Sequence, residues 1–139
     1  MKASSPHRIL NPHTLPPARG FSHAVVTSGG RTIYLGGQSG HRADGTLAGP
    51  GVVEQMNQAC ANVAEALLAA GGRPEHVVSV LIFVTDLMGY RAALQPIGEA
   101  WQKHFGKHYP AVSLFEVRSL YEPGALVELV CTAVVPSPT

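Results

Sequence analysis

The sequence predicts an α+β domain with the element order ββαβαββ, in which one mixed sheet carries two helices on one face. Two stretches, 77–84 and 126–135, predict the main strands because apolar residues occupy both of their faces. Two others, 52–70 and 95–105, repeat apolar residues at helical spacing. The 139 residues suffice for one sizeable core, and no linker or repeat divides them, so we expect a single domain over 1–139.

The expected elements before the first helix are short. Residues 1–19 contain four prolines and little apolar periodicity, which predicts an extended N-terminal arm. Residues 21–26 and 32–36 are β-prone and joined by Ser28-Gly29-Gly30, so we expect a hairpin with a glycine turn. The second strand ends at 36–38 (GGQ), where missing side chains let a backbone or a ligand come close. A polar, glycine-rich loop over 39–51 follows.

Two helices are expected, one on each side of the strand over 77–84. The first covers 52–70, because Val53, Met56, Cys60, Val63 and Leu67 recur every three or four residues and two glycines follow. The second is marked by Leu94, Ile97, Trp101 and Phe105, and it ends at Gly106. Pro96 suits the first turn of a helix, so we expect this helix to begin near Gln95, after a turn or short coil over 88–94.

The C-terminal part predicts a second hairpin, with strands over 112–120 and 126–135 and a turn at 121–124. The last strand is apolar on both faces except for one carboxylate, Glu128, in its second face. A strand of this kind must be covered on both sides. Two helices cover one face of the sheet only, so we predict a homo-oligomer packed sheet face to sheet face, with Glu128 in a desolvated place.

Composition argues against several classes of function. Charged residues make up 14% of the chain, the net charge is +1 and no Lys/Arg cluster occurs, so no nucleic-acid partner is expected. No apolar run reaches the roughly 18 residues of a membrane span and no signal peptide is evident, so we expect no membrane association and a cytoplasmic location. Cys60 and Cys131 are expected to be buried thiols. His104 and His108 are four residues apart, but Gly106 separates them, and no metal site is expected.

A series of short motifs runs from Pro17 to Val135. They are 18–24 (ARGFSHA), 33–38 (IYLGGQ), 55–63 (QMNQACANV), 69–71 (AAG), 83–87 (FVTDL), 109–111 (YPA) and 124–129 (GALVEL). In order and spacing they resemble the YjgF/RidA family of small trimeric proteins. The resemblance implies a chorismate-mutase-like fold, a homotrimer around a barrel-like core, and a cleft at each subunit boundary.

The resemblance also implies an activity, the hydrolysis of reactive enamines and imines to a 2-oxo acid and ammonia without a metal or organic cofactor. It implies that Glu128 handles the water and protons. The family's substrate-binding arginine falls on Val112, and its cysteine falls on Leu114. The remaining positions expected at the cleft are Phe21, Gly36, Gly37 and Gln38.

Val112 alters the expected specificity. A hydrogen bond to a charged group contributes roughly 1.5 to 3 kcal/mol, and valine offers neither charge nor donor. Arg118 shares a face with Val112 but lies about 20 Å away along the strand, too far to replace the arginine. Arg19 and Arg42, in the approaches to the cleft, are candidate substitutes. We therefore expect a substrate that is neutral or less acidic than a 2-imino acid.

Two alternatives stay open. The first is a non-catalytic trimer that binds a small molecule in the same apolar cleft. The second is an endoribonuclease activity, which the near-neutral charge and the absence of a basic stripe argue against.

Overall fold

The centre of the sheet is formed by β5 (Val77–Val84) and β7 (Val127–Val135), the two strands with apolar residues on both faces. The computed structural model describes residues 5–138, and within it the strand order is β3-β7-β5-β6, with β3 (Arg31–Tyr34) and β6 (Ala111–Glu116) outermost. A two-residue strand, β4 (Gln38–Ser39), also pairs with β7. The pairing of β5 with β6 is parallel and the others are antiparallel. The predicted α+β class with a mixed sheet is confirmed.

The predicted C-terminal hairpin is wrong, because β5 lies between β6 and β7. Ile82 of β5 is paired with Leu114 of β6 on one side and with Leu129 of β7 on the other. A strand that is apolar on both faces is best placed inside a sheet, where both of its edges are hydrogen-bonded. The segment after β6 crosses the end of β5 to reach β7, and Val117 N donates to Val84 O (2.8 Å) as it does so.

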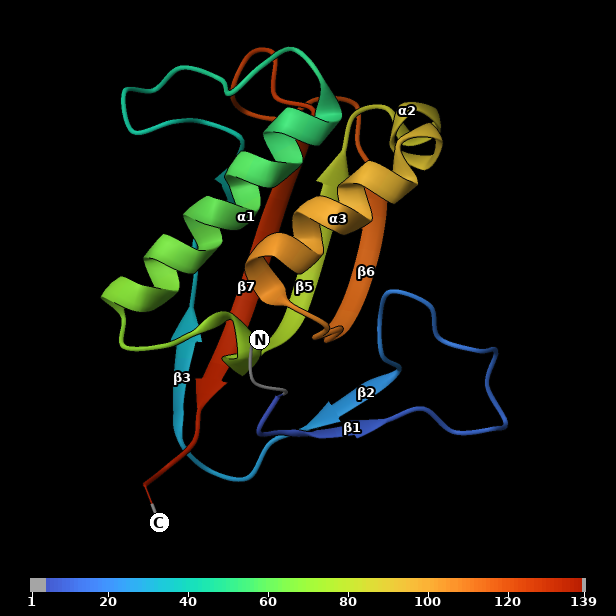
Figure 1. The fold of residues 1–139 in the computed structure, drawn as a ribbon, viewed down its shortest axis with the longest axis vertical. Coiled ribbons are helices and arrows are strands. Elements are labelled where there is room, and N and C mark those ends of the chain that lie inside the picture. Colours follow the sequence, from blue (N-terminus) through green and yellow to red (C-terminus); the bar gives the residue numbers. More distant parts are fainter. Residues whose placement is uncertain (1–4, 139) are drawn as a thin grey trace.

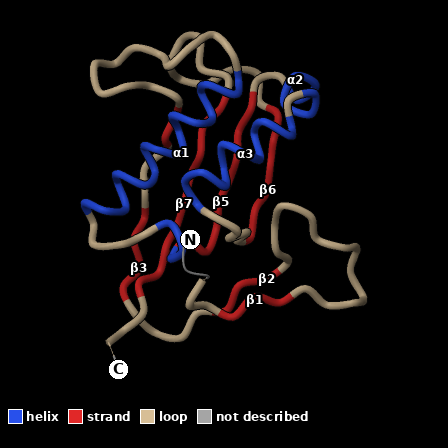
Figure 2. Tube along the Cα trace, viewed as in Figure 1, coloured by secondary structure: helices blue, strands red, loops and turns tan. Residues whose placement is uncertain are grey.

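The predicted N-terminal hairpin is also wrong. β2 (Ala24–Val26) pairs with β1 (Arg8–Leu10), so a strand lies inside the expected extended arm, and β3 pairs with β7 instead. Figure 2 shows the β1-β2 ribbon apart from the main sheet. The turn between β2 and β3 directs β3 toward β7. Gly30 has a φ of 108° and sits so close to the Val135 carbonyl that a Cβ would overlap it, so the turn joins the end of β7.

Two long helices, α1 (Val52–Ala69) and α3 (Leu94–Phe105), cover one face of the sheet (Figure 1), close to the predicted bounds. Gly106, with a φ of 67°, ends α3 as predicted. A short helix, α2 (Leu87–Ala92), replaces the expected turn or coil, because the Asp86 carboxylate accepts a hydrogen bond from Gly89 N (3.0 Å) and caps it. A single 3₁₀ turn, η1 (Pro74–His76), leads into β5.

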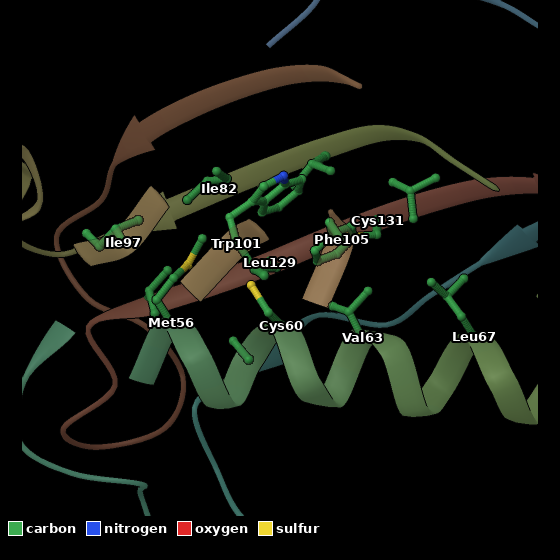
Figure 3. Packing of buried hydrophobic residues seen from close by; sticks show 14 of the residues in the cluster. Met56, Cys60, Val63, Leu67, Ile82, Ile97, Trp101, Phe105, Leu129 and Cys131 are labelled. Carbon is green, nitrogen blue, oxygen red and sulfur yellow. The ribbon is translucent and has the colours of Figure 1, made fainter. Parts of the chain in front are cut away.

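The core lies between these helices and the sheet (Figure 3), where one side of α1 faces β7. Both cysteines are buried, unpaired thiols, as predicted. Burial raises the pKa of the Cys60 thiol, and it raises the pKa of Cys131 to about 12. Neither thiol is therefore a nucleophile at neutral pH.

The second face of the sheet carries no helix in the described part of the chain (Figure 1). Apolar side chains lie on it in a row across β5 and β6. The rings of Phe83 and Phe115 stack there with centroids 5.7 Å apart, and Phe115 is 47% exposed. This is the face that the sequence predicts to be covered by other copies. No helix over residues 5–138 is long and apolar enough to cross a membrane.

Candidate functional site

Two hollows flank the sheet, one on each side. The first, of about 590 Å³, lies on the helix side between α3 and β6. The second, of about 410 Å³, lies around Glu128 on the other side, beside the loop that follows β4. Because β-strand side chains alternate between faces, the sheet itself separates the two hollows.

Glu128 lies in β7 between two neighbouring strands, opposite Phe83 of β5 on one side and Ser39 of β4 on the other. Its carboxylate rests against the backbone of Gly37, where a Cβ would overlap the carboxylate oxygen. A side chain at position 37 would therefore displace the carboxylate from this position. The half-buried carboxylate accepts no hydrogen bond from the rest of residues 5–138, so both oxygens remain able to bind water or a ligand.

A polar pair that sequence reasoning missed lies beside this carboxylate. Ser39 Oγ and His41 Nδ1 are 2.7 Å apart, and both side chains line the hollow around Glu128. Asn62 of α1 holds this loop in place, since its Nδ2 donates to the carbonyls of Ser39 (3.1 Å) and His41 (2.8 Å). The only signal in the sequence is a polar residue on each side of Gly40. The register that puts Ser39 opposite Glu128 depends on the pairing of β4 with β7, which are far apart in the sequence.

Of the two glycines and the glutamine expected at the cleft, Gly37 is the one that lines this hollow. Gln38 pairs with Leu129 and so shares its face of the sheet, opposite that of Glu128. Gly36 and Gln38 flank Gly37 in the chain. The Gln38 side chain folds back, with Nε2 donating to the Gly36 carbonyl at 3.4 Å. Its amide thus closes the strand end.

The other predicted site residues lie on the opposite side of the sheet. Val112 and Leu114 pair with Val80 and Ile82, and they point toward the helices. Together with Arg19 and Phe21 they line the 590 Å³ cavity. One chain therefore places the predicted site residues in two sets, with Glu128 on one face and Val112 on the other.

Of the two candidate substitutes for the missing arginine, only one reaches the cavity. Arg42 is used within its own loop, where it donates to the carbonyls of Leu47 and Ala48, each at 2.8 Å. Arg19 is exposed at the mouth of the cavity and makes no hydrogen bond or ion pair with another described residue. Arg19 is therefore the cation that can meet a ligand there.

The two histidines considered for a metal have separate partners. His104 Nε2 lies 3.0 Å from Asn57 Oδ1, and His108 Nε2 lies 2.7 Å from the Val77 carbonyl. Within residues 5–138 no three histidine, cysteine or carboxylate side chains gather as a metal site.

Comparison with known proteins gives one consistent match along nearly the whole chain. A family model described as endoribonuclease L-PSP matches residues 12–135. A 2-iminobutanoate/2-iminopropanoate deaminase from Capra hircus is 34% identical over 129 residues, which cover 91% of this chain and 89% of the goat protein. The protein of that name from Homo sapiens is 30% identical with the same coverage.

Solved structures agree with this match. A Rid-family protein of unknown function from Yersinia pestis superposes with a TM-score of 0.83 at 34% identity, covering 93% of this chain and 98% of that one. RidA from the Antarctic bacterium Psychrobacter sp. superposes with a TM-score of 0.66 at 26% identity, covering 92% and 99%. The helices and strands described above are thus arranged as in these proteins.

Proposed function

The chain belongs to the YjgF/RidA family, and we propose on that premise that it hydrolyses a reactive imine or enamine without a metal or organic cofactor. The observation that carries the proposal is the Glu128 carboxylate, which lies against Gly37 in a hollow and has no partner among residues 5–138. The names of the deaminase relatives agree with chemistry at a carbon–nitrogen double bond.

The proposed reaction uses Glu128 as acid and base. Its carboxylate takes a proton from water, the water oxygen bonds to the imine carbon, and the electron pair of the C=N bond moves to nitrogen, which takes a proton. The Glu128 carboxylate then takes the hydroxyl proton of the resulting carbinolamine, and the nitrogen takes a proton as the C–N bond breaks, so that ammonia leaves, a C=O bond forms and the carboxylate is restored. A positioned carboxylate contributes typically about 10²- to 10⁴-fold to such proton transfers.

The proposed site is complete only between copies of the chain. Glu128 and Val112 are on opposite faces of the sheet, so a single chain does not bring the acid to the apolar cavity. In the proposed homotrimer, the second sheet face of one copy is covered and its Glu128 approaches the cavity mouth of the next. The exposed Leu81 and Phe115 on that face support an assembly of this kind. A cytoplasmic location remains part of the proposal.

The proposed substrate carries no carboxylate at the end that meets Val112. An unpaired carboxylate against valine would lose its hydration without gaining a donor. An uncharged imine, or one whose charge lies far from the reacting carbon, avoids this loss. Activity on 2-iminopropanoate is therefore expected to be weak.

The test uses two imines generated in place, 2-iminopropanoate and the uncharged 2-iminobutane, with release of ammonia as the measurement. We expect the protein to accelerate hydrolysis of 2-iminobutane more than that of 2-iminopropanoate, and Val112→Arg to reverse this preference. Glu128→Gln should remove the acceleration in both backgrounds. If neither imine is hydrolysed faster than its spontaneous rate, with or without Val112→Arg, the hydrolase proposal is wrong.

The second candidate is a trimer that binds a small molecule without turnover. The cavity of about 590 Å³, lined mostly by apolar side chains, favours it, because its size is typical of ligand sites. Binding without acceleration of either imine would support this candidate. An endoribonuclease activity, which the family description names, finds no support in the net charge of +1.

A further inference from the structure

Nearly all residues that line the cavity between α3 and β6 are uncharged. Its wall consists of side chains such as Met56, Ile82, Ile97 and Trp101, which Figure 3 shows turned toward the same space between α1, α3 and the sheet. The one charged residue in its lining is Arg19, at the mouth. A space of this kind suits an apolar body about the size of an aromatic ring and its substituents.

One polar group in this wall lacks a partner. Tyr90 of α2 is only 7% exposed, yet its hydroxyl makes no hydrogen bond to another residue of the described chain. Every fully enclosed side-chain nitrogen or oxygen within residues 5–138 does have a partner. The Tyr90 oxygen must therefore border open space, and the cavity is the space that Tyr90 lines.

The Tyr90 hydroxyl is a donor at physiological pH. Burial is the main reason that its pKa is raised to about 12, with a smaller contribution from Cys60. It therefore keeps its proton and can give it to a carbonyl, imine or ether acceptor. Within the described chain this hydroxyl has no competing partner, so an acceptor placed there would take the hydrogen bond that it otherwise gives only to solvent.

A glycine borders this cavity on the solvent side. Gly98 lies inside α3, where glycine destabilises a helix by roughly 0.5 to 1 kcal/mol relative to alanine. Gly98 is exposed, and a Cβ added there would meet nothing within 4 Å. Packing therefore does not require glycine here, and a larger side chain has room to extend over the cavity that Gly98 lines.

We propose that this cavity binds an aromatic or branched apolar molecule, which places an uncharged hydrogen-bond acceptor at Tyr90 and leaves its polar remainder at the mouth beside Arg19. The inference rests on the proposed function for its catalytic meaning, since it names the substrate class of that site. The binding step itself requires no turnover.

The test uses fluorescence of Trp101, which is the single tryptophan of the chain and lines the cavity. Its Nε1 donates to the His108 carbonyl at 3.0 Å, which fixes the ring in the wall. The probe is phenylacetamide, with acetamide as the control that lacks the ring. We expect phenylacetamide to change the emission saturably and acetamide to leave it unchanged. Phenylacetate, which replaces the uncharged acceptor by a carboxylate, and phenylethylamine, which has no carbonyl acceptor, should both bind more weakly.

Three variants locate the site. Tyr90→Phe should weaken phenylacetamide binding by about 2- to 12-fold, the range expected for one neutral hydrogen bond. Tyr34→Phe, the same change at an 81% exposed position outside the cavity, should have no effect. Gly98→Leu should narrow the cavity and weaken binding while the protein stays folded, because leucine favours the helix. Wild-type binding by both Tyr90→Phe and Gly98→Leu, or equal responses to phenylacetamide and acetamide, would overturn the proposal.

The outcome separates this inference from the proposed function. Binding without imine hydrolysis would refute the hydrolase alone. Imine hydrolysis without saturable binding of phenylacetamide would refute the inference alone.

Discussion

The two hollows differ in how their polar groups are held. Around Glu128, polar groups gather, with Ser39 and His41 in contact and their loop fixed by Asn62 of α1. In the cavity under α3, a single unpartnered hydroxyl, Tyr90, faces an apolar wall. The comparison indicates that the two faces of the sheet have different roles. One face carries the proposed proton-transfer group, and the other carries an apolar cavity with a single free hydrogen-bond donor, the Tyr90 hydroxyl.

The largest expected effect is the loss of imine hydrolysis when the Glu128 carboxylate is removed. With 2-iminobutane as substrate, Glu128→Gln should lower kcat by about 10²- to 10⁴-fold, because the amide takes no proton from water. The fold should be unchanged, since glutamine has nearly the same shape. Ammonia release is the measurement. Glu65→Gln, an exposed position on α1, serves as the matched control and should keep the wild-type rate. A similar loss in both variants would contradict the assigned role.

The next effect compares how much a side chain on each face of β7 contributes to the free energy of unfolding. Leu129 is fully buried on the helix face, so Leu129→Ala should lower the free energy of unfolding by about 2 to 5 kcal/mol. Its neighbour Val130 points to the second face and is only half-buried, so Val130→Ala should lower it less. Denaturant titration measures both. Equal losses would mean that the second face is packed as tightly as the first, which close packing against other copies would produce.

A smaller effect concerns pH and the helix side of the sheet. Burial lowers the pKa of His108 below 6.5 and outweighs the hydrogen bond to the Val77 carbonyl, which acts in the opposite direction. The unfolded chain therefore takes up this proton at a higher pH than the folded chain. The stabilising contribution is complete above pH 6.5 and declines as the pH falls toward the folded pKa.

Thermal unfolding between pH 8 and pH 5 measures this effect. The unfolding temperature should depend less steeply on pH in His108→Gln than in the wild type. The pKa of His76 is also lowered by burial, so His76→Gln is the comparison variant and should flatten the slope only in part. A slope in His108→Gln as steep as in the wild type would assign the effect to other groups.

The smallest expected effect tests whether the glycine beside the cavity, Gly98, lowers the free energy of unfolding. Gly98→Ala should raise the free energy of unfolding by about 0.5 to 1 kcal/mol, because alanine favours the helix and its methyl group enters open space. Phenylacetamide should still bind, slightly more weakly. A loss of stability would show that the position is already tightly packed.

The sequence was sufficient for elements that depend on local pattern. The strand over 77–84 and the bounds of both long helices follow from apolar spacing, proline and glycine, and they agree with the structure. Strand pairing was not predictable in this way, because it depends on contacts between distant residues. Both expected hairpins failed for this reason, since the partners of β6 and β3 lie elsewhere in the chain.

The candidate site was predictable in its parts and not in its arrangement. Glu128 stands out as the one carboxylate in an apolar strand, and the resemblance identified Val112. Their separation onto opposite faces follows from the register of β5 with β6 and β7, which no local pattern reveals. Tyr90 was missed because it lies in a segment expected to be a turn or short coil, and Gly98 because no local pattern reveals the space beside it.

The position of β5 in the sheet has a consequence for synthesis of the protein. Both of its hydrogen-bonding partners, β6 and β7, follow it in the chain, and β7 ends only at Val135. As the chain leaves the ribosome, this apolar strand therefore has no sheet partner until β6 has been made, and its second edge stays unpaired until β7 follows. A chain truncated before β7 would be unable to complete the centre of its sheet.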